Sequence, residues 1–202
     1  MGLTNVIFED RVIENERLEL SDKDALYFLG DALTLRQCTL VLRVPTRRLH
    51  VNRVQFIDCT IVAQQELKNL QWSHAHLRGC RFQGRFHGNG FGNWRGTAEA
   101  SIEDCDFTEA HLDQTRFLSC DVRTIRFPSW PCFTLFDPVR RWRSLSALPW
   151  PGDIAPVVIQ GYAERPPSTA AVTYSAPDLA KRSGTTPEAI KAVLTTLEGV
   201  YY

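Results

Sequence analysis

The chain has 202 residues, 44% of them hydrophobic, and its 23 basic and 23 acidic side chains give a formal net charge of zero. This length fits one domain, or one domain with a small appendage, and the apolar content excludes wholesale disorder. A neutral chain is a poor candidate for unspecific binding to duplex DNA, which needs excess lysine and arginine, and for a whole-molecule mimic of DNA, which needs excess acid.

The charges are nevertheless segregated along the chain. Residues 1–31 carry eight acidic and three basic side chains, residues 32–97 are rich in arginine with only Asp58 and Glu66 as acids, and residues 98–128 are acidic again. Two interpretations stay open: solvated charge on alternating surfaces, or a banded surface that selects an oppositely charged partner.

The N-terminal segment predicts neither export nor membrane insertion. Residues 1–17 lack the basic start and apolar run of a secretory signal, and no stretch approaches the roughly 20 apolar residues of a membrane helix. We therefore expect a cytoplasmic protein without a membrane partner, whose six cysteines are reduced thiols. Residues 1–32 alternate apolar residues without a clear register, which predicts an irregular first coil or cap.

The central segment contains a repeat that its cysteines reveal. Cys38, Cys59 and Cys80 are evenly spaced, and the same local phrase returns around Cys105 and Cys120. Within this long period, large apolar residues recur at every fifth position, and a small or apolar residue precedes nearly every one by two. The large residues are Leu67, Trp72, Leu77, Phe82, Ile102, Phe107, Leu112, Phe117, Val122 and Phe127.

A period of five fits neither an amphipathic helix nor a simple strand. It fits a chain that turns a corner at every fifth residue, so that four sides make one coil. The large residue and the small residue before it point inward, and neighbouring coils pair as parallel strands. Since one coil cannot bury its own core, stability must come from stacking.

The repeat resembles the pentapeptide-repeat family, in which a small residue, Asp or Asn, and Leu or Phe precede two polar residues. The segments 105–109, 110–114 and 120–124 carry the resemblance, which is good over 65–83 and 98–127 and looser over 33–62. It implies an all-β fold, a right-handed quadrilateral parallel β-helix over residues 33–136. It specifies little about function, because one fold hosts many functions.

Two surfaces are candidates for partner binding. A four-residue insertion between Cys80 and Cys105 falls in the glycine-rich segment 86–96, and aromatic and arginine side chains on a loop are common interface anchors. The alternative is a bulge packed against the wall. The second surface is an acidic strip that follows this loop. The predicted binding residues are Arg85, His87, Phe91, Trp94 and Arg95 of the loop and Glu103, Asp104, Asp106, Glu109 and Asp113 of the strip.

Residues 137–202 predict an irregular, proline- and tryptophan-rich wrapping segment followed by a helical hairpin. The first helix begins at Ser175 or Ala176 and ends at Gly184, and the second is capped by Thr186 and extends to Glu198. Their spacing is similar to a helix-turn-helix, but the second helix offers Lys191 as its only basic residue. A hairpin that caps or docks is therefore favoured over one that reads DNA.

No catalytic residue, metal site or cofactor is predicted. The chain has no Cys-x-x-Cys pair, and five of its six cysteines fall at the inward small position, where thiols act as small apolar groups. His74 and His76 face outward with no carboxylate or nucleophile placed to complete a site with them. We expect a protein that is not an enzyme and has no small-molecule substrate.

The resemblance also implies a class of function. Small pentapeptide-repeat proteins with an irregular C-terminal extension are similar to immunity proteins of bacterial polymorphic-toxin or type VI secretion systems. The implied partner is a cognate toxin, whose basic face would suit the acidic strip if it is a nuclease. Two alternatives remain: a DNA-mimicking protector of gyrase, and a DNA-binding regulator that uses the terminal helices.

Overall fold

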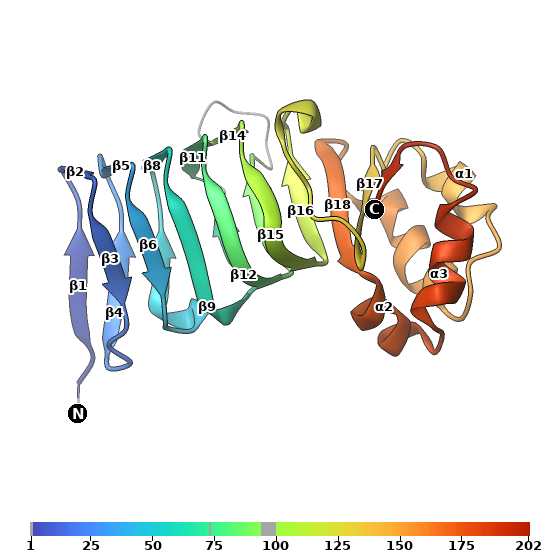
Figure 1. Ribbon diagram of the computed structural model, residues 1–202, viewed down its shortest axis with the longest axis horizontal. Coiled ribbons are helices and arrows are strands. Elements are labelled where there is room, and N and C mark those ends of the chain that lie inside the picture. Colours follow the sequence, from blue (N-terminus) through green and yellow to red (C-terminus); the bar gives the residue numbers. More distant parts are fainter. Residues whose placement is uncertain (1, 73, 94–99) are drawn as a thin grey trace.

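A computed structural model describes residues 2–72, 74–93 and 100–202, which form a parallel β-solenoid followed by a helical cap (Figure 1). Two sheets of five strands run along the solenoid. One contains β2 (Val12–Glu14), β5 (Thr34–Arg36), β8 (Val54–Ile57), β11 (Ala75–Arg78) and β14 (Ser101–Glu103). The other contains β3 (Arg17–Leu20), β6 (Thr39–Leu42), β9 (Thr60–Lys68), β12 (Arg81–His87) and β15 (Asp106–Asp113).

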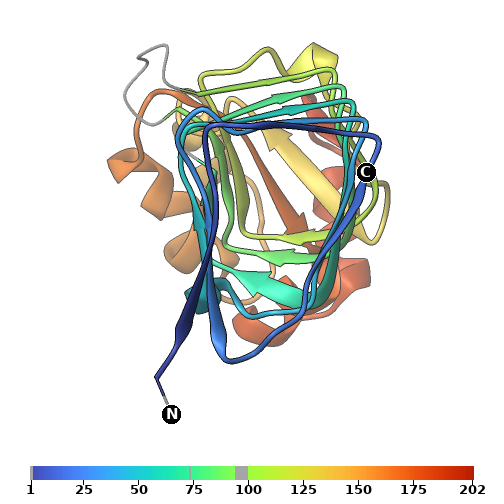
Figure 2. The ribbon, with the colours of Figure 1, turned by 90° about the vertical axis from the view of Figure 1, so that its left-hand side faces the viewer.

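Two further sheets complete the coils. The first contains β1 (Thr4–Phe8), β4 (Ala25–Leu29) and β7 (Leu49–Val51), and the second begins with β10 (Gln71–Trp72), β13 (Gly90–Gly92) and β16 (Thr115–Leu118). Two short helical turns, η1 (Thr46–Arg48) and η2 (Val122–Thr124), also belong to the coils. Viewed from the N-terminal end, the coils surround a single interior (Figure 2). The predicted parallel solenoid is confirmed.

The first coil is regular, so the prediction of an irregular segment over residues 1–32 is wrong. Strand β1 pairs in parallel with β4, and β2 pairs with β5. The rhythm is hidden because the step from Ile13 to its partner Leu35 is longer than the step from Leu35 to its own partner Phe56. The added residue changes the phase, so a search for one fixed period cannot align the first coil with the later ones.

A left-handed residue precedes each cysteine of the repeat. Gln37, Asp58, Gly79, Asp104 and Ser119 have φ angles of 50°, 53°, 64°, 52° and 49°. This conformation turns the chain at a corner, and glycine or short polar side chains adopt it at least cost. The turn leaves the next residue, the cysteine, pointing into the core, which explains why the two features recur together.

The cysteines form the predicted ladder inside the solenoid. Cys38, Cys59, Cys80 and Cys105 are buried, while Cys120 is partly buried. Each buried thiol lies near the carbonyl two positions before it, as Cys59 Sγ does at 3.3 Å from the Ile57 oxygen. A hydrogen bond with Cys105, together with burial, raises the pKa of Cys80 to about 12. The buried thiols therefore act as small apolar packing groups.

The segment after β12 continues the coil where a loop was expected. Phe86 and Phe91 are 1% and 0% exposed, and the Phe91 ring stacks on Trp72 and Phe117 at centroid distances of 5.6 and 5.5 Å. Phe91 thus fills the core, and the prediction that it anchors a partner is wrong. The described chain follows the coil as far as Asn93. Trp94 and Arg95 lie outside the described residues.

The C-terminal region is a packed cap, so the irregular wrapping segment is also corrected. Strand β18 (Thr169–Ser175) pairs antiparallel with β16, and β17 (Cys132–Phe136) and β19 (Val200–Tyr201) extend the sheet. A second core forms on this extension from residues such as Phe133, Leu145, Trp150 and Tyr162. The sheet is parallel up to β16 and antiparallel from β18 onwards. This change of strand direction ends the stacking of coils, so the cap closes the solenoid.

The cap contains three α-helices and two helical turns among its described residues. They are α1 (Trp142–Ser146), η3 (Ala155–Ile159), η4 (Gln160–Glu164), α2 (Ala176–Ser183) and α3 (Pro187–Leu194). Helix α2 ends at the left-handed Gly184, as predicted, and Thr186 caps α3. Helix α3 stops at Leu194, short of the expected Glu198, because the chain must turn back for β19 to pair with β17. Within the described ranges, no helix has the length and apolar character needed to cross a membrane.

Candidate functional site

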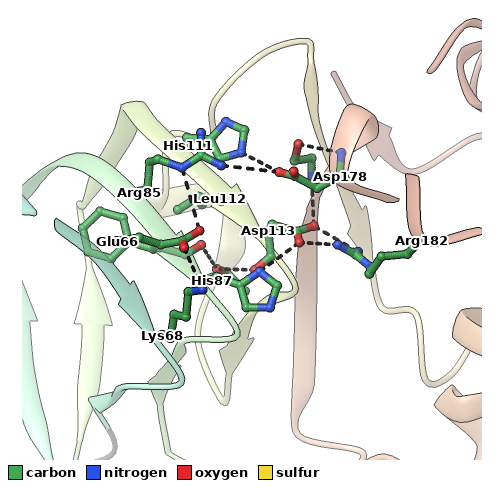
Figure 3. A network of polar contacts seen from close by, with 12 residues as sticks. Glu66, Lys68, Arg85, His87, His111, Leu112, Asp113, Asp178 and Arg182 are labelled. Atoms are coloured by element: carbon green, nitrogen blue, oxygen red, sulfur yellow. Dashed lines mark hydrogen bonds and ion pairs between the residues drawn. The ribbon is translucent and has the colours of Figure 1, made fainter. Parts of the chain in front are cut away.

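Asp113 lies at the junction between solenoid and cap (Figure 3). Its side chain is 2% exposed, and its Oδ2 atom lies 2.6 Å from Arg182 Nη1 of α2 and 3.1 Å from His87 Nδ1 of β12. The Ser175 backbone N–H donates to Oδ1 at 3.2 Å. Because this carboxylate is buried and bonded within the molecule, the prediction that Asp113 belongs to a partner-binding strip is wrong.

The same junction holds the polar residues that were predicted on a loop. Arg85 and His87 both extend from β12, and Arg85 lies 3.8 Å from Asp178 of α2 and 3.8 Å from Glu66 (Figure 3). His111 Nε2 lies 2.9 Å from Asp178 Oδ2. Burial opposes ionisation of Asp178, but the hydrogen bonds from His111 and Ser175 outweigh it and lower the pKa of Asp178. These contacts hold the cap to the solenoid.

The other acidic residues do not form one strip. Glu103 ends β14, Asp104 occupies the corner after it, and Asp106 and Glu109 lie on β15 in a different sheet. Asp106 is 3.0 Å from Arg126, and Glu109 accepts a hydrogen bond from Gln83. These four acidic side chains are therefore divided between two sheets. Asp106 and Glu109 already contact side chains of adjacent coils.

An outward apolar row on the first three coils is the surface that sequence reasoning missed. Ile7 of β1 pairs with Phe28 of β4, which pairs with His50 of β7. Ile7 is 46% exposed, and the Phe28 and His50 rings stack at 4.7 Å with an interplanar angle of 7°. Strand β4 explains the row because its inward residues are Ala25, Tyr27 and Leu29, whereas Leu26 and Phe28 face outward.

Carboxylates surround this apolar row. A shallow hollow of about 200 Å³ is lined by Ile7, Phe28 and His50 together with Glu9 and Asp31. Asp31 lies 3.8 Å from Arg53 of the next coil, and both side chains are exposed. A strand with one solvated face needs apolar residues only at alternate positions. The unbroken apolar run from Ala25 to Leu29 was therefore the sequence signal that the outer face of this strand is also apolar.

These surfaces present aromatic, aliphatic and charged side chains. In the described part of the chain, no three His, Cys, Asp or Glu side chains gather as metal ligands. The outward apolar row offers aromatic and aliphatic area with charged groups at its edge, which is the anatomy of many protein interfaces. Comparisons with protein-family models and with curated proteins found no match to this chain.

Proposed function

We propose that this chain binds another protein through the outward apolar row formed by Ile7, Phe28 and His50. The single observation that supports this proposal is the outward row in which Phe28 stacks on the exposed His50, with carboxylates at its rim. Monomeric soluble proteins rarely expose contiguous apolar surface without a use for it, and aromatic side chains dominate the energy of interfaces. The eight acidic and three basic side chains of residues 1–31 favour a basic partner.

We further infer that the solenoid is the right-handed quadrilateral coil of the pentapeptide-repeat family. The stacked parallel coils, the five-residue repeat and the left-handed corners support this proposal. Within that family, the chain fits a cytoplasmic, non-enzymatic immunity protein that neutralises a cognate bacterial toxin. A nuclease toxin has the basic surface that the acidic first coil, residues 1–31, would attract.

The structure gives less support to the alternative in which the terminal helices read DNA. Arg182 of α2 contacts Asp113, and α3 buries Ile190 and Leu194 in the second core. A gyrase-protecting mimic of DNA is disfavoured by the zero net charge of the chain. Protein binding therefore remains the function that we propose.

The test is a binding measurement with a defined partner. The protein encoded by the neighbouring upstream gene is purified, and its affinity for this chain is measured by isothermal titration calorimetry. We expect a stable complex that Phe28→Glu weakens at least about a hundredfold, as for a central interface residue. Val157→Glu is the control, because Val157 is another exposed apolar residue, 68% accessible, but belongs to the cap. Absence of a complex, or equal affinities for the two variants, would contradict the proposal.

A further inference from the structure

A polar cavity lies at the seam between solenoid and cap. Its volume is about 190 Å³, and its lining includes Asn69, Gln114 and Arg116 of the solenoid and Tyr162, Arg165 and Tyr174 of the cap. Asn69 and Gln114 occupy left-handed corners, with φ angles of 57° and 52°. Strands β16 and β18, which contribute Arg116 and Tyr174 to its lining, lie at the other end of the solenoid from β1 and β4, so the cavity is separate from the outward apolar row (Figure 1).

Two arginines line this cavity. Arg116 extends outward from β16 between the buried residues Thr115 and Phe117, and Arg165 follows η4. No Asp or Glu is among the described residues that line the cavity. Burial, and then the charge of Arg165, lower the pKa of Arg116. An anion bound between the two arginines would be attracted by both positive charges.

The two tyrosines that line the cavity add a hydrogen-bond donor. The Tyr162 and Tyr174 hydroxyl oxygens are 2.7 Å apart, so one hydroxyl donates to the other. The proton of the second hydroxyl then remains available to another acceptor. Burial raises the pKa of both tyrosines, which keeps them neutral donors. With the amides of Asn69 and Gln114, the cavity presents donors from several directions.

We propose that this cavity binds a phosphate-type anion, either the free ion or the phosphate group of a small organic ligand. The planar guanidinium of arginine matches phosphate oxygens with paired hydrogen bonds, and a tetrahedral anion accepts from donors on several sides at once. The ligand would connect Arg116 of the solenoid to Arg165 of the cap. Binding would therefore also stabilise the folded chain.

The experiment titrates the purified chain with inorganic phosphate and, separately, with AMP, at an ionic strength held constant with sodium chloride. We expect saturable one-site binding by calorimetry and a rise in Tm with either ligand. A preference for AMP would identify an organic phosphate, and a preference for phosphate would identify the free ion. Saturable binding of neither would overturn the proposal, and this result would leave the separate protein-binding proposal unaffected.

Variants locate the site. Arg165→Gln changes an exposed residue and should weaken binding by at least about tenfold, since a hydrogen bond to a charged group is lost. Arg116→Gln should do the same, with circular dichroism used to verify its fold. Arg140→Gln is the matched control, because Arg140 is exposed and does not line the cavity. Wild-type affinity in Arg165→Gln, or equal weakening in Arg140→Gln, would overturn the proposal.

Discussion

The Asp113 carboxylate of the solenoid lies 2.6 Å from the Arg182 guanidinium of the cap, although the two residues are far apart in the sequence. This ion pair connects β15, the last strand of its sheet, to α2. The side chain of Asp113 is 2% exposed and that of Arg182 is 34% exposed, so the arginine is the partner that water can still reach. Stability predictions for the junction follow from this asymmetry.

Replacement of Asp113 by asparagine should destabilise the protein. The change removes the charge that Arg182 and His87 contact and places an amide donor in a site built from donors. We expect the free energy of unfolding to fall by about 3 kcal/mol, because breaking a buried ion pair is costly. Urea denaturation measures this change. Glu103→Gln, at an exposed position, should change stability by less than about 0.5 kcal/mol, and similar losses in both variants would contradict the role of the junction.

Gly84 should not tolerate a side chain. It has a φ angle of 102°, and a Cβ atom there would lie 2.1 Å from the Ala63 carbonyl oxygen of the previous coil. Gly84→Ala should therefore lower the free energy of unfolding by about 2 kcal/mol or more. Gly161→Ala is the control, since no atom lies within 4 Å of the added carbon. Thermal unfolding compares the two variants. Equal Tm values would contradict the prediction, because they would show that the coils can move apart at Gly84 without loss of stability.

The cysteine ladder predicts a loss of stability in alkali. The pKa of Cys80 is about 12 in the folded protein, above the ordinary thiol value of roughly 8.5 in the unfolded chain. A raised folded pKa contributes stability that is complete below the unfolded value and is lost as pH rises toward the folded value. Each such thiol should lower the free energy of unfolding by about 1.4 kcal/mol per pH unit in that window. Denaturation between pH 8 and pH 10.5 tests this, and Cys80→Ala should show a shallower slope; an unchanged slope would contradict it.

The lowered pKa of Asp178 predicts a loss of stability as pH falls, the opposite of the effect of the thiols. Its pKa is lowered in the folded protein despite burial, because His111 and Ser175 hydrogen-bond to it. The resulting stability is present above the unfolded value of roughly 3.9 and is lost as pH falls through the lower folded value. The free energy of unfolding should therefore decrease from pH 5 to pH 3. Asp178→Asn should decrease less over the same range, whereas a parallel decrease would argue against this contact.

The sequence predicted the features that depend on local repetition. The inward positions of Cys80, Phe82 and Phe107, the parallel stacking and the end of α2 at Gly184 follow from spacing and corner chemistry. The first coil was missed because one added residue shifts its phase. The burial of Phe91 was missed because a short coil, from Trp72 to Phe91, precedes a longer one, from Phe91 to Phe117.

Neither candidate site could be assembled from the sequence. The row of Ile7, Phe28 and His50 spans two unequal intervals, and its members belong to a part of the chain with no clean register. Asp113 forms an ion pair with Arg182, which is 69 residues away in the sequence. Arg182 belongs to the cap, and the packing of the cap does not follow from the repeat. Charge patterning alone therefore assigned Asp113 to the surface.

Because each coil contacts only its neighbours, the two ends of this molecule are structurally independent. The outward apolar row belongs to the first three coils, whereas the cap rests on the last ones. Duplication of the segment 60–80, which is one complete coil, would lengthen the rod by one strand spacing, about 4.8 Å, and disturb neither end. A lineage of such proteins could thus vary its reach by gene duplication while keeping both surfaces unchanged.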